Sequence, residues 1–136
     1  MRDDRARAGE RVLVVEDDSD YLTYLGMRLG GDGWEVHTAR NGAEALEALE
    51  SQPCDAVICD IRMPVIDGLE LCRRLRADPR HRTLPVMILS GAEDSGEIGK
   101  VVGLGHIWYL RKGASHARLR RTLRHLLDSA LTQPTH

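Results

Sequence analysis

Four short apolar runs constrain the fold of this chain more than any other feature of its sequence. They occupy residues 12–15, 56–59, 86–89 and 107–110. Unbroken apolar runs of this length are typical of strands that are buried on both faces, as in a parallel sheet. A fifth segment, residues 34–38, alternates apolar with polar side chains, which favours an edge strand with one wetter face.

Helical patterns lie between these strands. Apolar residues recur at helical spacing over residues 21–29, 41–49, 69–75 and 119–131. Asn41 is a suitable N-cap for the second of these segments. Residues 93–104 contain three glycines, each of which costs about 1 kcal/mol relative to alanine inside a helix, so we expect a short, frayed or mobile helix there. The alternation of strand and helix predicts an α/β fold, a doubly wound five-stranded parallel sheet with helices on both faces.

The length and hydropathy of the chain set its organisation. It has 136 residues, of which 42% are hydrophobic, and we expect one domain at residues 11–131 between tails at 1–10 and 132–136. No apolar run approaches the roughly 18–20 residues that a membrane span needs. The charged first ten residues do not resemble a signal peptide, so we expect a cytoplasmic protein without membrane contact.

Charge and cysteine content argue against several kinds of site. The net charge is -2, so bulk electrostatics does not predict direct nucleic-acid binding. Three cysteines without a C-x-x-C pair argue against a disulfide framework and a zinc site. The arginines of the last helix are interpreted as a solvated face, or alternatively as a docking surface for an acidic partner: Arg118, Arg120, Arg121 and Arg124.

Polar residues with related chemistry follow the predicted strands. Glu16 and Asp17 follow the first apolar run, Asp60 and Ser90 follow two others, and Lys112 comes just after the last. Ligands of open parallel sheets bind beyond the carboxyl ends of the strands, where these side chains would meet. Three clustered carboxylates repel one another, and a hard divalent cation such as Mg²⁺ relieves that repulsion. An aspartate, a metal, a lysine and a hydroxyl together form a site for a phosphoryl group on a carboxylate.

Four motifs in this order resemble those of the receiver domain of bacterial two-component response regulators. The matching segments are residues 12–18, residues 60–64 with Asp67-Gly68, residues 90–92, and residues 109–112. The resemblance covers about residues 11–131. It implies a flavodoxin-like fold with strand order 2-1-3-4-5 and a signalling domain that catalyses only its own phosphorylation and dephosphorylation.

The resemblance assigns the phosphoacceptor and the metal site. Asp60 aligns with the aspartate that accepts the phosphoryl group. Glu16 and Asp17 align with the acidic pair that organises Mg²⁺ or Mn²⁺, with Asp17 the more direct ligand. Asp60 and the backbone carbonyl of Arg62 complete the implied metal ligands.

The resemblance also assigns the residues that contact the phosphoryl group and transmit the signal. Ser90, Gly91 and Lys112 align with the phosphoryl-contacting residues, and Ser90 and Tyr109 align with the pair that moves on activation. The implied partners are a histidine kinase or a phosphotransfer protein carrying phosphohistidine, and a downstream protein that binds the face of helix 4, strand 5 and helix 5. A homodimer is possible. Tyr109 is equally open to interpretation as a core aromatic.

Three features depart from the family pattern. Gly113 stands where the family usually has proline after the lysine, so the aim of Lys112 is less fixed. Arg62 lies two positions after Asp60, where its side chain can reach the phosphoryl group or the attacking water. Residues 103–108 are glycine-rich and carry Trp108, for which packing or partner contact is the expected role.

Other functions stay open at this point. A degenerate receiver would keep the fold and act as a protein-binding module that is independent of phosphorylation. An aspartate-nucleophile phosphatase of the haloacid dehalogenase type would carry a second Asp where Arg62 stands. The chain could also be the receiver part of a longer regulator.

Overall fold

A computed structural model of the protein describes residues 3–91 and 95–132. The expectations for Ala92, for the start of the fourth helix at 93–94 and for the tail residues 133–136 lie outside these ranges. Strands and helices alternate along the described chain as the sequence predicts: β1 Arg11–Val15, α1 Ser19–Gly31, β2 Glu35–Ala39, α2 Gly42–Ser51, β3 Ala56–Asp60, α3 Gly68–Ala77, β4 Val86–Ser90, α4 Ser95–Val102, β5 Ile107–Arg111 and α5 His116–Thr132.

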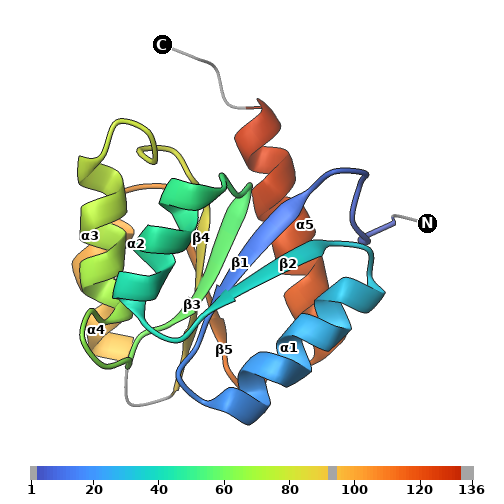
Figure 1. Ribbon diagram of the computed structural model, residues 1–136, viewed down its shortest axis with the longest axis horizontal. Helices are drawn as coiled ribbons and strands as arrows, with labels where there is room; N and C mark the ends of the chain where they lie inside the picture. The colour runs from blue at the N-terminus through green and yellow to red at the C-terminus, as the bar shows by residue number, and fades with distance from the viewer. Residues whose placement is uncertain (1–2, 92–94, 133–136) are drawn as a thin grey trace.

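The five strands form one parallel sheet in the order β2-β1-β3-β4-β5, which confirms the predicted order (Figure 1). β3 and β4 are buried at every position, as their apolar runs predict. The same prediction is wrong for β5, where Tyr109 is 62% exposed and Arg111 is also exposed. The reason is position: β5 pairs only with β4 and forms an edge of the sheet, where side chains reach solvent.

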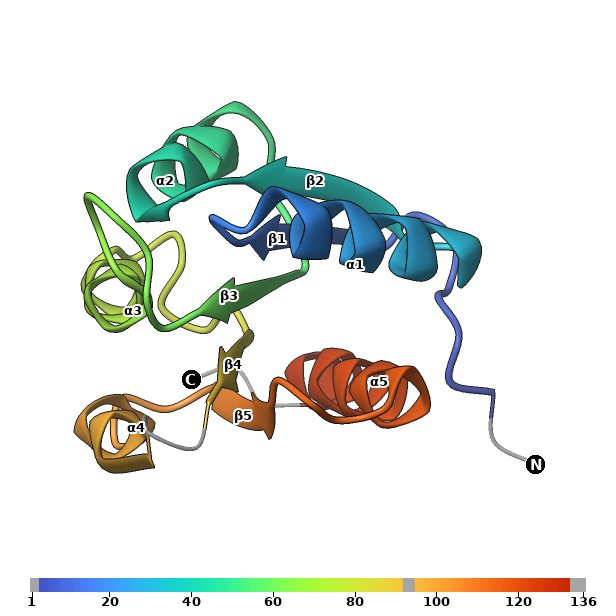
Figure 2. The same cartoon turned by 90° about the horizontal axis from the view of Figure 1, so that it is seen from below.

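Helices cover both faces of the sheet (Figure 2). On one face, Leu25 of α1 and Leu123 of α5 pack in one cluster with Met87 of β4. On the other face, α2, α3 and α4 supply a second cluster that includes Cys72 and Val101. Successive residues of a strand point to opposite faces, so the inner strands contribute apolar side chains to both clusters. Within the described residues, no helix combines the length and apolarity needed to cross a membrane.

Aspartate and asparagine side chains begin three of the helices. Asp18 accepts hydrogen bonds from the backbone N–H groups of Asp20 and Tyr21, at 3.0 and 3.2 Å. Asn41 caps α2 as predicted, and Asp67 accepts from the N–H of Glu70 at the start of α3. Such caps satisfy N–H groups that have no partner inside the helix. Asp18 and Asp67 therefore have structural roles at the sheet edge where the other carboxylates gather.

Arg76 of α3 holds the connections that lead into β4 and β5. Its guanidinium donates hydrogen bonds to four carbonyl oxygens, those of His81, Leu84, Gly105 and His106, at 2.6 to 2.9 Å. Gly105 and His106 both have positive φ, 85° and 58°, a conformation that costs a non-glycine residue energy. The bonds from Arg76 stabilise this turn and so fix the point where β5 begins.

The burial of Arg124 shows that the arginines of α5 do not all lie on a solvated face or a docking surface, contrary to what the sequence suggested. Its side chain is 2% exposed and lies 2.7 Å from Glu10 and 3.0 Å from Asp128. Glu10 also accepts a hydrogen bond from the indole N–H of Trp34, and the N–H of Ala6 donates to the carbonyl of Asp32. Helical spacing could not show that the chain before β1 brings a carboxylate to this side of α5.

Candidate functional site

The parallel register brings the predicted site residues to one edge of the sheet. Val15 pairs with Cys59, and Asp60 pairs with Leu89, so β1, β3 and β4 end at about the same level. Beyond the strands, the N–H of Lys112 donates to the carbonyl of Ser90 over 3.0 Å. Residues from four parts of the chain therefore share one small region, as the sequence predicts.

Three carboxylates form the centre of this region. Glu16, Asp17 and Asp60 each offer one oxygen, and the three oxygens lie within 4.8 Å of one another. Glu16 is 2% exposed and Asp60 is 9% exposed, whereas Asp17 is exposed to solvent. Burial raises the pKa of Glu16 above its ordinary value, although contacts with Lys112 and the Asp18 N–H act in the opposite direction.

Lys112 places a positive charge beside two of these carboxylates. Its Nζ lies 2.8 Å from Glu16 Oε1 and 3.1 Å from Asp60 Oδ2. Partial burial acts to lower the pKa of Lys112, but its bonds to Glu16 and Asp60 outweigh burial and raise the pKa. The amine is therefore held in its charged form beside Asp60.

The acidic cluster has the chemistry of a divalent cation site. Carboxylate oxygens are the ligands that Mg²⁺ prefers, and Mg²⁺ is usually held by one or two carboxylates together with water. Glu16 Oε1 is buried and has no well-aligned hydrogen-bond donor among the described residues, although Lys112 lies close to it. The other oxygen of Glu16 accepts from the N–H of Asp18 at 3.1 Å. The three carboxylates present thus fit a divalent metal ion.

The loop from β3 to α3 packs tightly against Asp60. The N–H of Gly68 donates to the carbonyl of Ile61, and a Cβ added to Gly68 would lie 2.2 Å from the carbonyl oxygen of Asp60. Val65 has φ 69° in a γ-turn closed by the bond from the Ile66 N–H to the Pro64 carbonyl, a strained conformation for a β-branched residue. The sequence predicts a turn here, but it does not reveal that Gly68 supports the backbone of Asp60.

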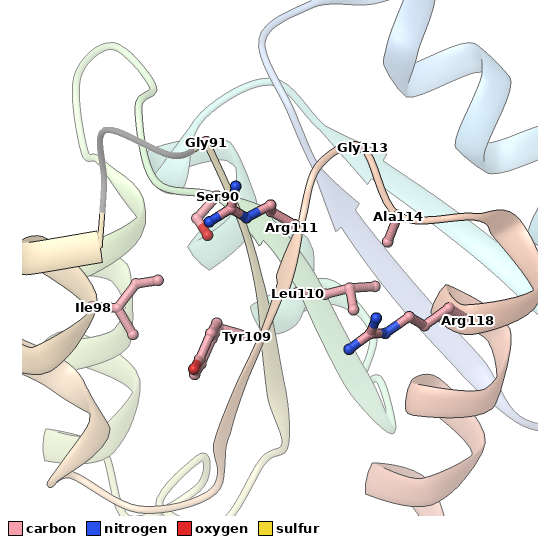
Figure 3. A pocket seen from close by; sticks show the side chains of 9 residues that line it. All are labelled: Ser90, Gly91, Ile98, Tyr109, Leu110, Arg111, Gly113, Ala114 and Arg118. Carbon is pink, nitrogen blue, oxygen red and sulfur yellow. The ribbon is translucent and has the colours of Figure 1, made fainter.

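Arg62, Ser90 and Tyr109, the other residues of interest near this end of the sheet, differ in their exposure. The exposed Arg62 lines a cleft of about 490 Å³ together with Asp17 and Asp67. Ser90 is buried, whereas the ring of Tyr109 lies outside the core, so the interpretation of Tyr109 as a core aromatic is wrong. Both residues line a second cavity of about 470 Å³, and Figure 3 shows Tyr109 on the same side of β5 as Ile98 of α4.

Tyr21 is a site residue that the sequence analysis assigned only to the apolar side of a helix. Its ring lies under the amine of Lys112, with Nζ 4.9 Å from the ring centre, and it stacks on Tyr24. A cation over an aromatic face is attracted by the ring quadrupole. A Cβ added to Gly113 would meet no heavy atom within 4 Å, so side-chain packing at this position does not aim Lys112. The contact of Tyr21 joins the first turns of α1 to the residue after β5, so no local spacing in the sequence identifies it.

Comparison with known proteins places this geometry in one family. The family described as the response regulator receiver domain matches residues 12–124. The chain is 38% identical over 119 residues to the response regulator MprA of Mycolicibacterium vanbaalenii, covering 86% of this chain and 50% of that protein. The chain thus spans about half the length of the curated relatives it matches.

Solved structures agree with the family match. The signal receiver domain of a signal transduction histidine kinase from Syntrophus aciditrophicus superposes with a TM-score of 0.84 at 28% identity, over 94% of this chain and 97% of that one. The receiver domain of a sensor histidine kinase from Pseudomonas aeruginosa gives a TM-score of 0.80 at 30% identity, over 89% and 99% of the two chains. That structure has a magnesium ion coordinated in its active-site cleft.

Proposed function

Because the chain belongs to the response regulator receiver domain family of two-component systems, we propose that it accepts a phosphoryl group on Asp60 from a phosphohistidine. The donor is a histidine kinase or a histidine phosphotransfer protein. The observation that carries this proposal is the contact of Asp60 with Lys112 at 3.1 Å, inside a cluster that also holds Glu16 and Asp17.

The proposed reaction transfers one phosphoryl group between two side chains. A carboxylate oxygen of Asp60 attacks phosphorus while the bond from phosphorus to the histidine nitrogen breaks, and the electron pair stays on the imidazole. Lys112 stabilises the negative charge on the phosphoryl oxygens. Asp17, Asp60 and the carbonyl of Arg62 would hold Mg²⁺ or Mn²⁺, with Glu16 supporting them. When bound, such an ion would supply further charge neutralisation to the transferring group.

The same arrangement supports a switch. Ser90 is the last residue of β4 and Gly91 follows it. The hydroxyl of Ser90 and the N–H of Gly91 are proposed to contact the phosphoryl oxygens. Ser90 shares the cavity of about 470 Å³ with the exposed Tyr109, which gives the ring space to turn inward as Ser90 moves. That movement changes the surface of α4, β5 and α5, through which the domain is proposed to control a downstream protein.

Intact mass spectrometry tests the proposal. The protein is incubated with Mg²⁺ and acetyl phosphate, and its mass is compared with those of two variants, Asp60→Asn and Asp20→Asn. Asp20 is an exposed aspartate in the first turn of α1 and serves as the matched control. We expect one phosphoryl group on the wild type and on Asp20→Asn, none on Asp60→Asn, and none when Mg²⁺ is removed. An adduct of equal yield on Asp60→Asn would contradict the proposal.

A degenerate receiver is the second candidate, and the observation that favours it is that a glycine without side-chain packing follows Lys112. In that case, acetyl phosphate would not phosphorylate Asp60, and a beryllium fluoride mimic would not bind there. The domain would then act through proteins that bind its unphosphorylated fold.

A further inference from the structure

The last third of the chain has an unusual charge distribution. Between Glu97 and Asp128 the sequence contains no aspartate or glutamate but seven lysines and arginines, although the whole chain has a net charge of -2. This stretch forms most of α4, all of β5 and the first two-thirds of α5. Any negative charge that neutralises it must therefore come from elsewhere in the fold or from another molecule.

Four of these seven cations are neutralised within the domain. Lys100 pairs with Glu97, and Lys112 pairs with Glu16 and Asp60. Arg120 lies 3.3 Å from Asp32, and Arg124 is buried against Glu10 and Asp128. The other three are exposed and form no ion pair with a described residue: Arg111, Arg118 and Arg121.

Two of the three unpaired arginines lie beside an apolar cavity. Arg111 and Arg118 line the cavity of about 470 Å³ together with Ile98, Leu110 and Ala114. Figure 3 shows the guanidinium of Arg111 beside Ser90 and that of Arg118 beside Leu110, with Tyr109 projecting near Ile98. Arg121 follows Arg118 by three residues and so extends the positive charge along α5. We call Arg111, Arg118, Arg121 and this cavity the basic face.

We infer that the basic face binds an acidic segment of a partner protein. The carboxylates of that segment pair with the arginines, and an apolar side chain that lies between these carboxylates enters the cavity. Charge complementarity of this kind selects partners and speeds their association. The inference rests on the proposed function, because it names the class of partner that the face of α4, β5 and α5 receives.

The same charges argue against a second copy of this chain as the occupant. A two-fold dimer places the same patch against itself, so arginines would meet arginines with no carboxylate of that stretch to separate them. Like charges placed across an interface weaken association. The homodimer that the family resemblance leaves possible is therefore not expected through the basic face.

Nucleic acid is the other anionic macromolecule to consider. The lining of the cavity includes Ile98, Leu110 and Ala114, which suit an aliphatic or aromatic side chain better than a phosphate backbone. Tyr109 is the one exposed aromatic among the described residues that line it, whereas single-stranded nucleic acid is bound on several aromatic platforms. The observations favour a protein segment.

The test uses the full chain without phosphodonor, so that its outcome does not depend on phosphorylation of Asp60. The probe is a fluorescent random copolymer of glutamate and tyrosine, and its affinity is measured by anisotropy. A lysine–tyrosine copolymer and a single-stranded oligonucleotide are measured in parallel. The test variant is Arg111→Glu with Arg118→Glu, and the control is Arg40→Glu with Arg82→Glu, two exposed arginines outside the basic face.

We expect the test variant to bind the glutamate–tyrosine copolymer about tenfold more weakly than the wild type, and the control less than twofold more weakly. The lysine–tyrosine copolymer should not bind the wild type. Equal losses in the two variants would overturn the inference, as would tighter binding of the oligonucleotide than of the copolymer. Sedimentation velocity adds a second measurement: a wild-type dimer that Arg118→Glu dissociates would contradict it. Failure of Asp60 to accept phosphate would reject the proposed function and leave these measurements unchanged.

Discussion

Replacement of Gly68 by alanine tests whether the loop from β3 to α3 holds Asp60 in place. The added Cβ would lie 2.2 Å from the carbonyl oxygen of Asp60 and 3.0 Å from the Cα of Ile61. Both neighbours are backbone atoms, so no side chain can rotate away. Ordinary contact begins at 3.4 Å, and the loop must therefore move by about 1.2 Å relative to β3.

The expected cost follows from this displacement. Overpacking that shifts the backbone costs about 3 kcal/mol, and the lower conformational entropy of unfolded alanine offsets up to about 1 kcal/mol of it. The net loss of about 2 kcal/mol should lower the Tm by roughly 8 °C for a domain of this size. Because Asp60 moves, the rate of phosphorylation by acetyl phosphate should also fall.

A second glycine provides the control. A Cβ on Gly99 in α4 would meet nothing within 4 Å, so Gly99→Ala should raise the free energy of unfolding by about 0.5–1 kcal/mol. Thermal unfolding followed by circular dichroism measures both variants, and the mass adduct follows phosphorylation. A Gly68→Ala variant with the wild-type Tm and phosphorylation rate would refute this reasoning.

Three further predictions concern single side chains. Tyr21→Leu should slow phosphorylation up to about fivefold by removing about 1 kcal/mol of attraction for the Lys112 amine, whereas Tyr21→Phe should keep the wild-type rate; equal rates in both variants would argue against the contact. Arg62→Ala should speed the decay of phosphorylated protein, followed by mass after removal of acetyl phosphate, and an unchanged decay would exclude a protective role for this arginine. Burial acts to raise the pKa of Glu10, but bonds such as that from Arg124 outweigh burial and lower the pKa. The charge of Glu10 therefore stabilises the fold above about pH 4.5, and this stability is lost as the pH falls through the lowered pKa. Glu10→Gln should therefore cost about 1 kcal/mol in urea unfolding at pH 7 and less at pH 3; the same loss at both values would contradict the assignment.

Several features of the fold and site could be predicted because they depend on local sequence and sheet geometry. An apolar run followed at once by a charged residue places that residue at a strand end. Parallel strands then bring Glu16, Asp60 and Lys112 to one edge. There the amine of Lys112 lies 2.8 Å from a carboxylate oxygen of Glu16 and 3.1 Å from one of Asp60. The N-cap at Asn41 is local in the same sense, since it depends on only three following residues.

Other features depend on which elements become neighbours, and the sequence pattern does not contain that information. β5 has an apolar run like β3, but it forms an edge of the sheet and exposes Tyr109. Arg124 lies on a helix rich in arginine, and its burial depends on Glu10 from the start of the chain. Tyr21 and Gly68 each fit a local role, while their contacts with Lys112 and Asp60 arise only in the folded sheet.

The central claim is that Asp60, rather than a neighbouring carboxylate, carries the phosphoryl group. The phosphorylated protein should be treated with borohydride, which reduces an aspartyl phosphate to homoserine, and digested for peptide sequencing by mass spectrometry. We predict homoserine at position 60, dependent on both Mg²⁺ and acetyl phosphate, with Glu16 and Asp17 unmodified. Homoserine at position 17, a reduced side chain at position 16, or no modified peptide would contradict the account.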